Sequence, residues 1–320
     1  MATYKEIYGS TIEVVTSDPP NPVEGQVWYN STDNVVKGAA LTTAGSWATG
    51  GDLNTARNNL GGAGTQTAAL GFGGYSPGSG GVAVTESYNG TSWTEVNDLG
   101  TARYFLTGCG TQTAALGFGG MSPVTGNTET WNGTSWTEVN NLNTARRSLA
   151  GAGTNTSALG FGGTPPTTGV TESWNGTSWT EVNDLNTARN RLAGIGADNT
   201  AVLAFGGFSG SPTYLAVTET WNGTSWTEVN DLNSLRQDVA GAGTNTTGLA
   251  FGGSIPPNTG ATEEWNGTSW TEVNDLNTAR GGLAGAGNQT AALGFGGLGG
   301  VATEEWDVGP QAINVTFTDS

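Results

Sequence analysis

The chain has 320 residues, a formal net charge of −17 and no histidine. Nucleic-acid binding depends largely on Lys and Arg that neutralise phosphates, so this acidic chain is not expected to bind nucleic acid. Without histidine, Ser-His-Asp and Cys-His catalysis are excluded.

Residues 1–44 are expected to form a β-rich arm. Residues 1–10 carry charges and no apolar core segment, so a signal peptide is not expected. Residues 11–15 alternate between polar and apolar types, and residues 26–29 with 35–37 have the pattern of a hairpin. No run approaches the roughly 18 apolar residues of a membrane span, so no membrane insertion is expected.

From residue 45 onward, a unit of roughly 44 residues recurs six times. Its most regular stretch, WNGTSWTEVNDLNTAR, is complete at residues 174–189 and 265–280, and the first copy is degenerate. The six copies end at Arg57, Arg103, Arg146, Arg189, Arg236 and Arg280. A repeat of this length indicates that each unit is one structural module.

Each unit has the local pattern of four short antiparallel strands. In the third unit these are expected at residues 149–153, 158–161, 170–174 and 177–182. The Asn-Gly pair between the last two predicts a type I′ hairpin turn, because both residue types accept a positive φ. No segment has a helical apolar period.

The order of the strands favours a closed ring. A single sheet cannot bury both faces, so the units must stack, and a ring leaves no apolar end exposed. The sixth unit lacks its fourth strand, and residues 44–51 supply one. We therefore predict an all-β, six-bladed β-propeller with four antiparallel strands per blade, its last blade closed by an N-terminal strand. The predicted boundaries are 1–44 for the arm, 45–306 for the propeller and 307–320 for a tail strand.

Two resemblances add to this interpretation. A glycine pair, Glu-x-Trp, a second Trp and an Arg, as at 119–120, 129–131, 136 and 146, resemble the kelch repeat over residues 45–306. Some kelch propellers are copper oxidases whose metal sites use His, so we expect no metal or other cofactor here. The sequence of the repeat, together with that of residues 25–32, also resembles predicted tail-fibre or other virion proteins of marine bacteriophages. That resemblance implies location in a virion.

The repeat arginines and a matching set of glutamates are candidate structural residues. Each glutamate precedes a strand aromatic by two positions, so it lies on the same strand face and needs a partner if buried. The glutamates are Glu86, Glu129, Glu172, Glu219, Glu263 and Glu304. A ring of arginines that grips an anion is the alternative. The carboxylates repeat around the ring and form no unique pair, so no catalytic residues and no enzymatic activity are expected.

Binding is expected on the loops between the second and third strands, which differ in every unit. Large apolar residues on these loops are the binding candidates, with solvent-exposed filler as the alternative for any one of them. They are Tyr75, Met121, Phe208, Tyr214 and Ile255. The expected function is a non-enzymatic phage structural or adhesion protein whose partners are other virion proteins or a host-surface glycan or protein. The alternative is a soluble cellular kelch scaffold that binds carbohydrate or protein.

Overall fold

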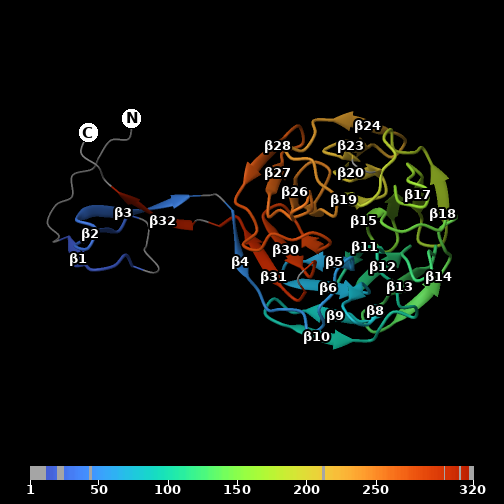
Figure 1. The fold of residues 1–320 in the computed structure, drawn as a ribbon, viewed down its shortest axis with the longest axis horizontal. Helices are drawn as coiled ribbons and strands as arrows, with labels where there is room; N and C mark the ends of the chain where they lie inside the picture. Colours follow the sequence, from blue (N-terminus) through green and yellow to red (C-terminus); the bar gives the residue numbers. More distant parts are fainter. Residues whose placement is uncertain are drawn as a thin grey trace. The chain divides into compact units, whose positions relative to one another are not determined.

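The computed structural model describes residues 12–19, 25–42, 45–210, 213–298, 300–309 and 311–316. The chain divides into two compact units, one of Met1–Gly45 with Val308–Ser320 and one of Ser46–Asp307 (Figure 1). Residue 11 of the predicted first strand and residues 317–318 of the predicted tail strand lie outside the described residues. The two units are described separately below.

The smaller unit is a four-stranded sheet made from both ends of the chain. Its strands, in spatial order, are β1 (Glu13–Val15), β2 (Val27–Asn30), β3 (Val35–Thr42) and β32 (Gln311–Thr316). β1 runs parallel to β2, and the other two pairings are antiparallel. Trp28 on β2 is fully buried, and its indole Nε1 donates to Asp18 Oδ1 at 3.0 Å. The expected hairpin is therefore extended by the tail strand into a sheet.

The larger unit consists of repeated four-stranded antiparallel sheets, which confirms the all-β repeat prediction. The first strands of its six sheets are β5 (Gly61–Thr65), β11 (Thr107–Thr111), β15 (Ala150–Gly153), β19 (Ala193–Asp198), β25 (Ala240–Gly243) and β29 (Ala284–Gly287). The second strands are β6 (Ala68–Phe72), β12 (Ala114–Phe118), β16 (Ala158–Phe161), β20 (Ala201–Phe205), β26 (Gly248–Phe251) and β30 (Ala291–Phe295). The third strands are β9 (Thr85–Tyr88), β13 (Thr128–Trp131), β17 (Thr171–Trp174), β23 (Thr218–Trp221), β27 (Thr262–Trp265) and β31 (Thr303–Asp307). The fourth strands are β10 (Trp93–Val96), β14 (Trp136–Val139), β18 (Trp179–Val182), β24 (Trp226–Val229), β28 (Trp270–Val273) and β4 (Ser46–Thr49).

The sixth sheet combines the two ends of this unit. β4 pairs antiparallel with β31, so that Trp47 lies opposite Trp306 and Ser46 opposite Asp307. The larger unit accordingly begins and ends one residue later than residues 45–306.

The first strands lie closest to a common centre (Figure 1). Each contacts the first strand of the next sheet, and β29 contacts β5. Crowding there explains the small residues of these strands. A Cβ atom on Gly285 would lie 2.4 Å from the carbonyl oxygen of Gly241, a backbone atom of the neighbouring sheet. Only glycine fits at such a position.

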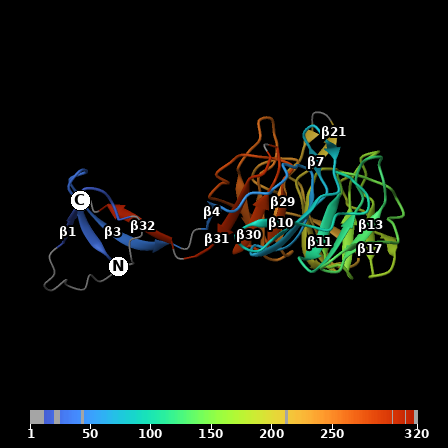
Figure 2. The ribbon, with the colours of Figure 1, turned by 90° about the horizontal axis from the view of Figure 1, so that it is seen from below.

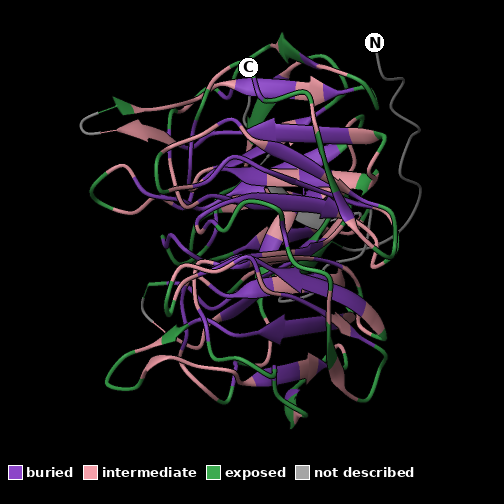
Figure 3. Ribbon diagram, turned by 90° about the vertical axis from the view of Figure 1, so that its right-hand side faces the viewer, coloured by how far each residue is buried: buried purple, intermediate pink, exposed green. Residues whose placement is uncertain are grey.

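Between adjacent sheets, aromatic rings and an indole hydrogen bond form a repeated core. A phenylalanine at the end of each second strand packs against the fourth-strand tryptophan of the next sheet, with ring centroids 4.7–5.0 Å apart. The same tryptophan donates its indole N–H, at 3.0–3.1 Å, to a third-strand threonine of the preceding sheet. Figure 3 shows the buried residues concentrated in the strands and the exposed ones in the connections.

The Asn-Gly turns differ from the type I′ prediction. Gly176 has a φ of 91°, but Asn175 is not among the residues with positive φ. Four residues separate the two strands, and the Asn175 Oδ1 accepts the backbone N–H groups of Thr177 and Ser178, both at 2.9 Å. The longer loop leaves asparagine in its ordinary conformation and uses its side chain as a cap.

Candidate functional site

The six repeat arginines are structural in their placement. Each is buried, with a side chain no more than 2 % exposed, and each forms an ion pair with the repeat glutamate of its own sheet. The pairs are Arg57–Glu86, Arg103–Glu129, Arg146–Glu172, Arg189–Glu219, Arg236–Glu263 and Arg280–Glu304. Because their guanidinium groups face carboxylates inside the fold, they do not present a ring of cations to a ligand.

The first pair shows how other residues of the repeat support this ion pair. Arg57 Nη2 lies 2.9 Å from Glu86 Oε1, and its Nη1 donates to the carbonyl oxygens of Gly73 and Val84 at 2.9 and 2.6 Å. The backbone N–H of Asn54 donates to Glu86 Oε2 at 2.7 Å. Burial lowers the pKa of Arg57, and the carboxylate of Glu86 acts in the opposite direction.

A ring of six residues surrounds the centre of the larger unit, each two positions after a repeat arginine. All six have positive φ values, between 52° and 68°. They are Asn59, Phe105, Ser148, Arg191, Asp238 and Gly282. The backbone N–H of each donates to the carbonyl oxygen of its counterpart in the preceding sheet, at 2.7–3.0 Å, and Asn59 donates to Gly282. The six hydrogen bonds thus form a cycle. We call these residues the central ring.

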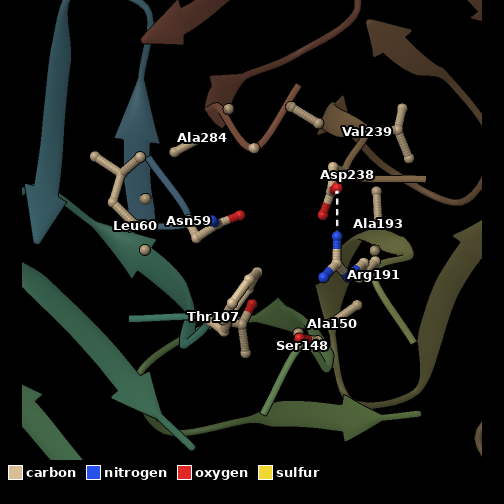
Figure 4. Close-up of a pocket in the computed structure, with 18 of the residues that line it drawn as sticks. Asn59, Leu60, Thr107, Ser148, Ala150, Arg191, Ala193, Asp238, Val239 and Ala284 are labelled. Atoms are coloured by element: carbon tan, nitrogen blue, oxygen red, sulfur yellow. Dashed lines mark hydrogen bonds and ion pairs between the residues drawn. The ribbon is translucent and has the colours of Figure 1, made fainter. Parts of the chain in front are cut away.

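The central ring borders a cavity of about 140 Å³ on the axis of the unit (Figure 4). Figure 4 shows Asn59 opposite Arg191 and Asp238, which form an ion pair at 3.1 Å. Arg191 and Asp238 are the ionisable residues that line the cavity. Loss of contact with water raises the pKa of Asp238, and the charge of Arg191 opposes that rise.

Phe105, Ser148 and Arg191 in the central ring are unusual for their backbone conformation, which Asn and Asp tolerate better. A left-handed conformation costs a residue with a Cβ atom roughly 1–2 kcal/mol, and glycine avoids this cost. Gly282 is the only member that does so, and the other five are all different from one another. Strain of this kind concentrates at functional sites, so the cavity is the strongest candidate site.

Three of the five predicted loop residues pair with residues next to the central ring. In two sheets the loop is itself a small hairpin, β7 (Tyr75–Ser76) with β8 (Gly80–Gly81) and β21 (Phe208–Gly210) with β22 (Thr213–Tyr214). β7 and β21 lie on the same face of the unit (Figure 2). Backbone bridges join Tyr75, Met121 and Phe208 to the residues just before the central ring, Asn58, Tyr104 and Asn190.

The candidates differ in exposure. Tyr75 is 38 % exposed and lies edge-on to Tyr104, with ring centroids 5.4 Å apart. Phe208 and Tyr214 are half-buried and pack against each other at 5.5 Å, while Met121 and Ile255 are also half-buried. Tyr75 is therefore the most accessible of the five.

Several residues in or near the site are not among the five predicted candidates. Phe105, Arg191 and Asp238 line the cavity, and Tyr104 and Arg147 contact Phe105. Leu235 and Leu298 are exposed apolar residues, and Leu298 lies on a loop between a second and a third strand. A signal was present in the sequence. The two positions after each repeat arginine vary between units, whereas their neighbours repeat, and Leu235 stands where other units have alanine.

No protein-family model matches this chain, and no curated protein matches it either. Within the described ranges, His, Cys, Asp and Glu residues form no group of three that could hold a metal ion. Among these same residues, no helix is long and apolar enough to cross a bilayer.

Proposed function

We propose that residues 46–307 form a closed, six-bladed propeller of the kelch type that serves as a non-enzymatic adhesion component of a phage particle. One observation carries the proposal of binding. The repeated arginines, glutamates, threonines, tryptophans and phenylalanines form ion pairs, inter-sheet hydrogen bonds and aromatic packing, whereas the residues of the central ring, which line the cavity, and those of the adjoining loops differ between repeats. A partner that recognises one defined site must contact residues that are not repeated.

Closure and the six-blade count are supported by the cycle of hydrogen bonds in the central ring and by the pairing of β4 with β31. The kelch assignment rests on the spacing of the glycine pair, Glu-x-Trp, Trp and Arg. The phage assignment rests on the resemblance of the repeat sequence and of residues 25–32 to virion proteins. Other virion proteins, and a glycan or protein on the host surface, are the proposed partners.

The test compares the two faces of the larger unit. Labelled full-length protein is applied to candidate host cells and to an array of bacterial glycans. We call the face that carries the loops between second and third strands, and the connections from fourth strands to the next sheet, the variable face. A triple variant, Tyr75→Ser, Leu235→Ser and Leu298→Ser, should lose at least tenfold in affinity, about 1.4 kcal/mol, because these three are exposed large apolar residues on that face.

The matched control is Thr177→Ala with Thr224→Ala, two exposed positions in the repeated turns at the other ends of the strands. This variant should bind as the wild type does. Equal affinity of all three proteins would contradict binding through the variable face. Mass spectrometry of purified particles tests the phage assignment, and the protein's absence from them would favour a cellular binding propeller.

A further inference from the structure

The arginines outside the repeat converge on one aromatic ring. Of eight arginines in the chain, six form the buried repeat pairs, and the remaining two are Arg147 and Arg191. The guanidinium carbon of Arg191 lies 5.2 Å from the centroid of the Phe105 ring, and that of Arg147 lies 5.9 Å from it. These distances are within the range of cation–π attraction. In a chain with a net charge of −17, the two remaining arginines thus contact one aromatic ring that lines the cavity.

The local charge at this point is positive. Arg191 is balanced by Asp238 at 3.1 Å. Arg147 contacts the sulfur of Met121 and the ring of Phe105, and among the described residues no carboxylate lies within ion-pair distance of it. Two guanidinium groups and one carboxylate leave one positive charge. An anion with a single charge would neutralise it, whereas a dianion would leave a negative charge in an acidic protein.

An aromatic path leads from the cavity to the surface. The rings of Phe105 and Tyr104 have centroids 5.3 Å apart, and those of Tyr104 and Tyr75 are 5.4 Å apart. Tyr75 is 38 % exposed at the outer end. We call Tyr75, Tyr104, Phe105, Arg147 and Arg191 the aromatic–arginine strip. Apolar rings combined with a few placed polar groups are typical of sites for small ring-shaped ligands.

The backbone gives an independent reason to assign a role to the strip. Phe105 and Arg191 have φ values of 55° and 53°, in the left-handed region, where the equivalent residue of the sixth sheet is glycine. The fold therefore accepts glycine at this position of the repeat. Two bulky side chains that bring conformational strain are placed where they face each other and the cavity.

We propose that the aromatic–arginine strip binds a sugar residue that carries one carboxylate, as in an acidic glycan. The carboxylate is held by the guanidinium groups of Arg147 and Arg191, whose planar donors match carboxylate geometry. Phe105 positions the two guanidinium groups, and the apolar face of the sugar lies against Tyr104 and Tyr75. This inference rests on the proposed adhesion function and names the chemistry of its ligand.

The experiment is calorimetric titration of the full chain with methyl β-D-glucuronide and with its neutral counterpart, methyl β-D-glucoside. The glucuronide should bind at least tenfold more tightly, and raising the salt concentration should weaken its binding but not that of the glucoside. Arg147→Ala should lower glucuronide affinity at least tenfold. Gln237→Ala, at the equivalent position of the fifth sheet, should leave it unchanged.

Phe105→Gly is the second variant, because glycine is relaxed at a positive φ and the fold should be retained. Its melting temperature should match or exceed that of the wild type, while glucuronide affinity falls at least tenfold. Equal binding of the two sugars, or glucuronide binding unchanged by Arg147→Ala, would overturn the inference. Tighter binding of N-acetylglutamate α-amide, which carries one carboxylate, than of glucuronide would also overturn it in favour of a peptide carboxylate.

These outcomes are separable from the fate of the proposed function. If the wild type adheres to cells or glycans and Phe105→Gly adheres equally well, adhesion stands and the acidic-sugar site is wrong. If neither the wild type nor any variant adheres to any surface, the proposed adhesion function itself fails.

Discussion

Asn59 donates its backbone N–H to the carbonyl oxygen of Gly282 at 2.7 Å, which links the first sheet of the larger unit to the sixth. Phe105 donates to Asn59 in the same way, and each later member of the central ring donates to the one before it. The hydrogen bond between the two ends of the repeat is therefore of the same kind as those inside it. This equivalence allows each interface to be tested against another of the same chain.

The buried ion pairs predict that substitutions of two adjacent arginines will lower the free energy of unfolding by very different amounts. Arg146→Ala should lower the free energy of unfolding by about 3–5 kcal/mol, because it leaves the buried Glu172 without its partner. Arg147→Ala should cost about 1 kcal/mol or less, since Arg147 has no carboxylate partner among the described residues. Urea denaturation of both variants measures the difference, and equal costs would contradict a structural role for the repeat arginine.

If β4 is the fourth strand of the sixth sheet, Trp47 should be as important to stability as the fourth-strand tryptophan of any other sheet. Trp47 is 6 % exposed, lies 4.8 Å from the Phe251 ring and donates to Thr262 Oγ1. Trp47→Ala should therefore cost about 3–5 kcal/mol. Trp226→Ala, which removes the equivalent contacts with Phe161 and Thr171, is the matched comparison. If Trp47→Ala is nearly neutral while Trp226→Ala is not, β4 does not complete the sixth sheet.

Much of the fold could be predicted because the six copies of the repeat can be aligned with one another. The recurrence of the glycine pair, the tryptophans and the arginine places the four strands of each unit without knowledge of their packing. The turn at Asn175 and Gly176 was harder to predict, because Asn-Gly suits both a two-residue hairpin and a longer loop. The asparagine side chain decides between them by accepting two backbone N–H groups.

The candidate site could be predicted only in part. Variation between repeats pointed to the loop containing Tyr75, which does reach the surface next to the site. The contribution of Phe105, Arg191 and Asp238 depends on a left-handed backbone that turns them toward a shared axis. Their residue types alone do not indicate that conformation, because Phe and Arg usually avoid positive φ and Asp adopts it in only a minority of cases.

The environment of Cys109 predicts an unreactive thiol. Its side chain is 6 % exposed, and burial raises its pKa to about 12. The thiolate is the reactive form, so a disulfide reagent at pH 8 should modify native protein far more slowly than protein unfolded in guanidinium. Rapid modification of the native protein would show that the inner strand β11 opens readily.

The smaller unit should respond to acid through Asp18. Its hydrogen bond with Lys37, and further ones from Asn30 and Trp28, lower its pKa to about 2 from 3.8. A lowered pKa stabilises the unit fully above pH 3.8, and this contribution is lost as the pH falls toward 2. The indole N–H resonance of Trp28 should report the loss over that window, and Asp18→Asn should remove the pH dependence. A resonance that shifts mainly above pH 4 would contradict this assignment.

Hydrogen exchange of backbone amides tests closure of the repeat most directly. The amide of Asn59 bonds to Gly282 across the contact between the first and sixth sheets, and the amide of Asp238 bonds to Arg191 between two internal sheets. If the six sheets form one closed propeller, the two amides should have protection factors within about tenfold of each other, because their interfaces are equivalent. Rapid exchange at Asn59 with strong protection at Asp238 would contradict a closed ring.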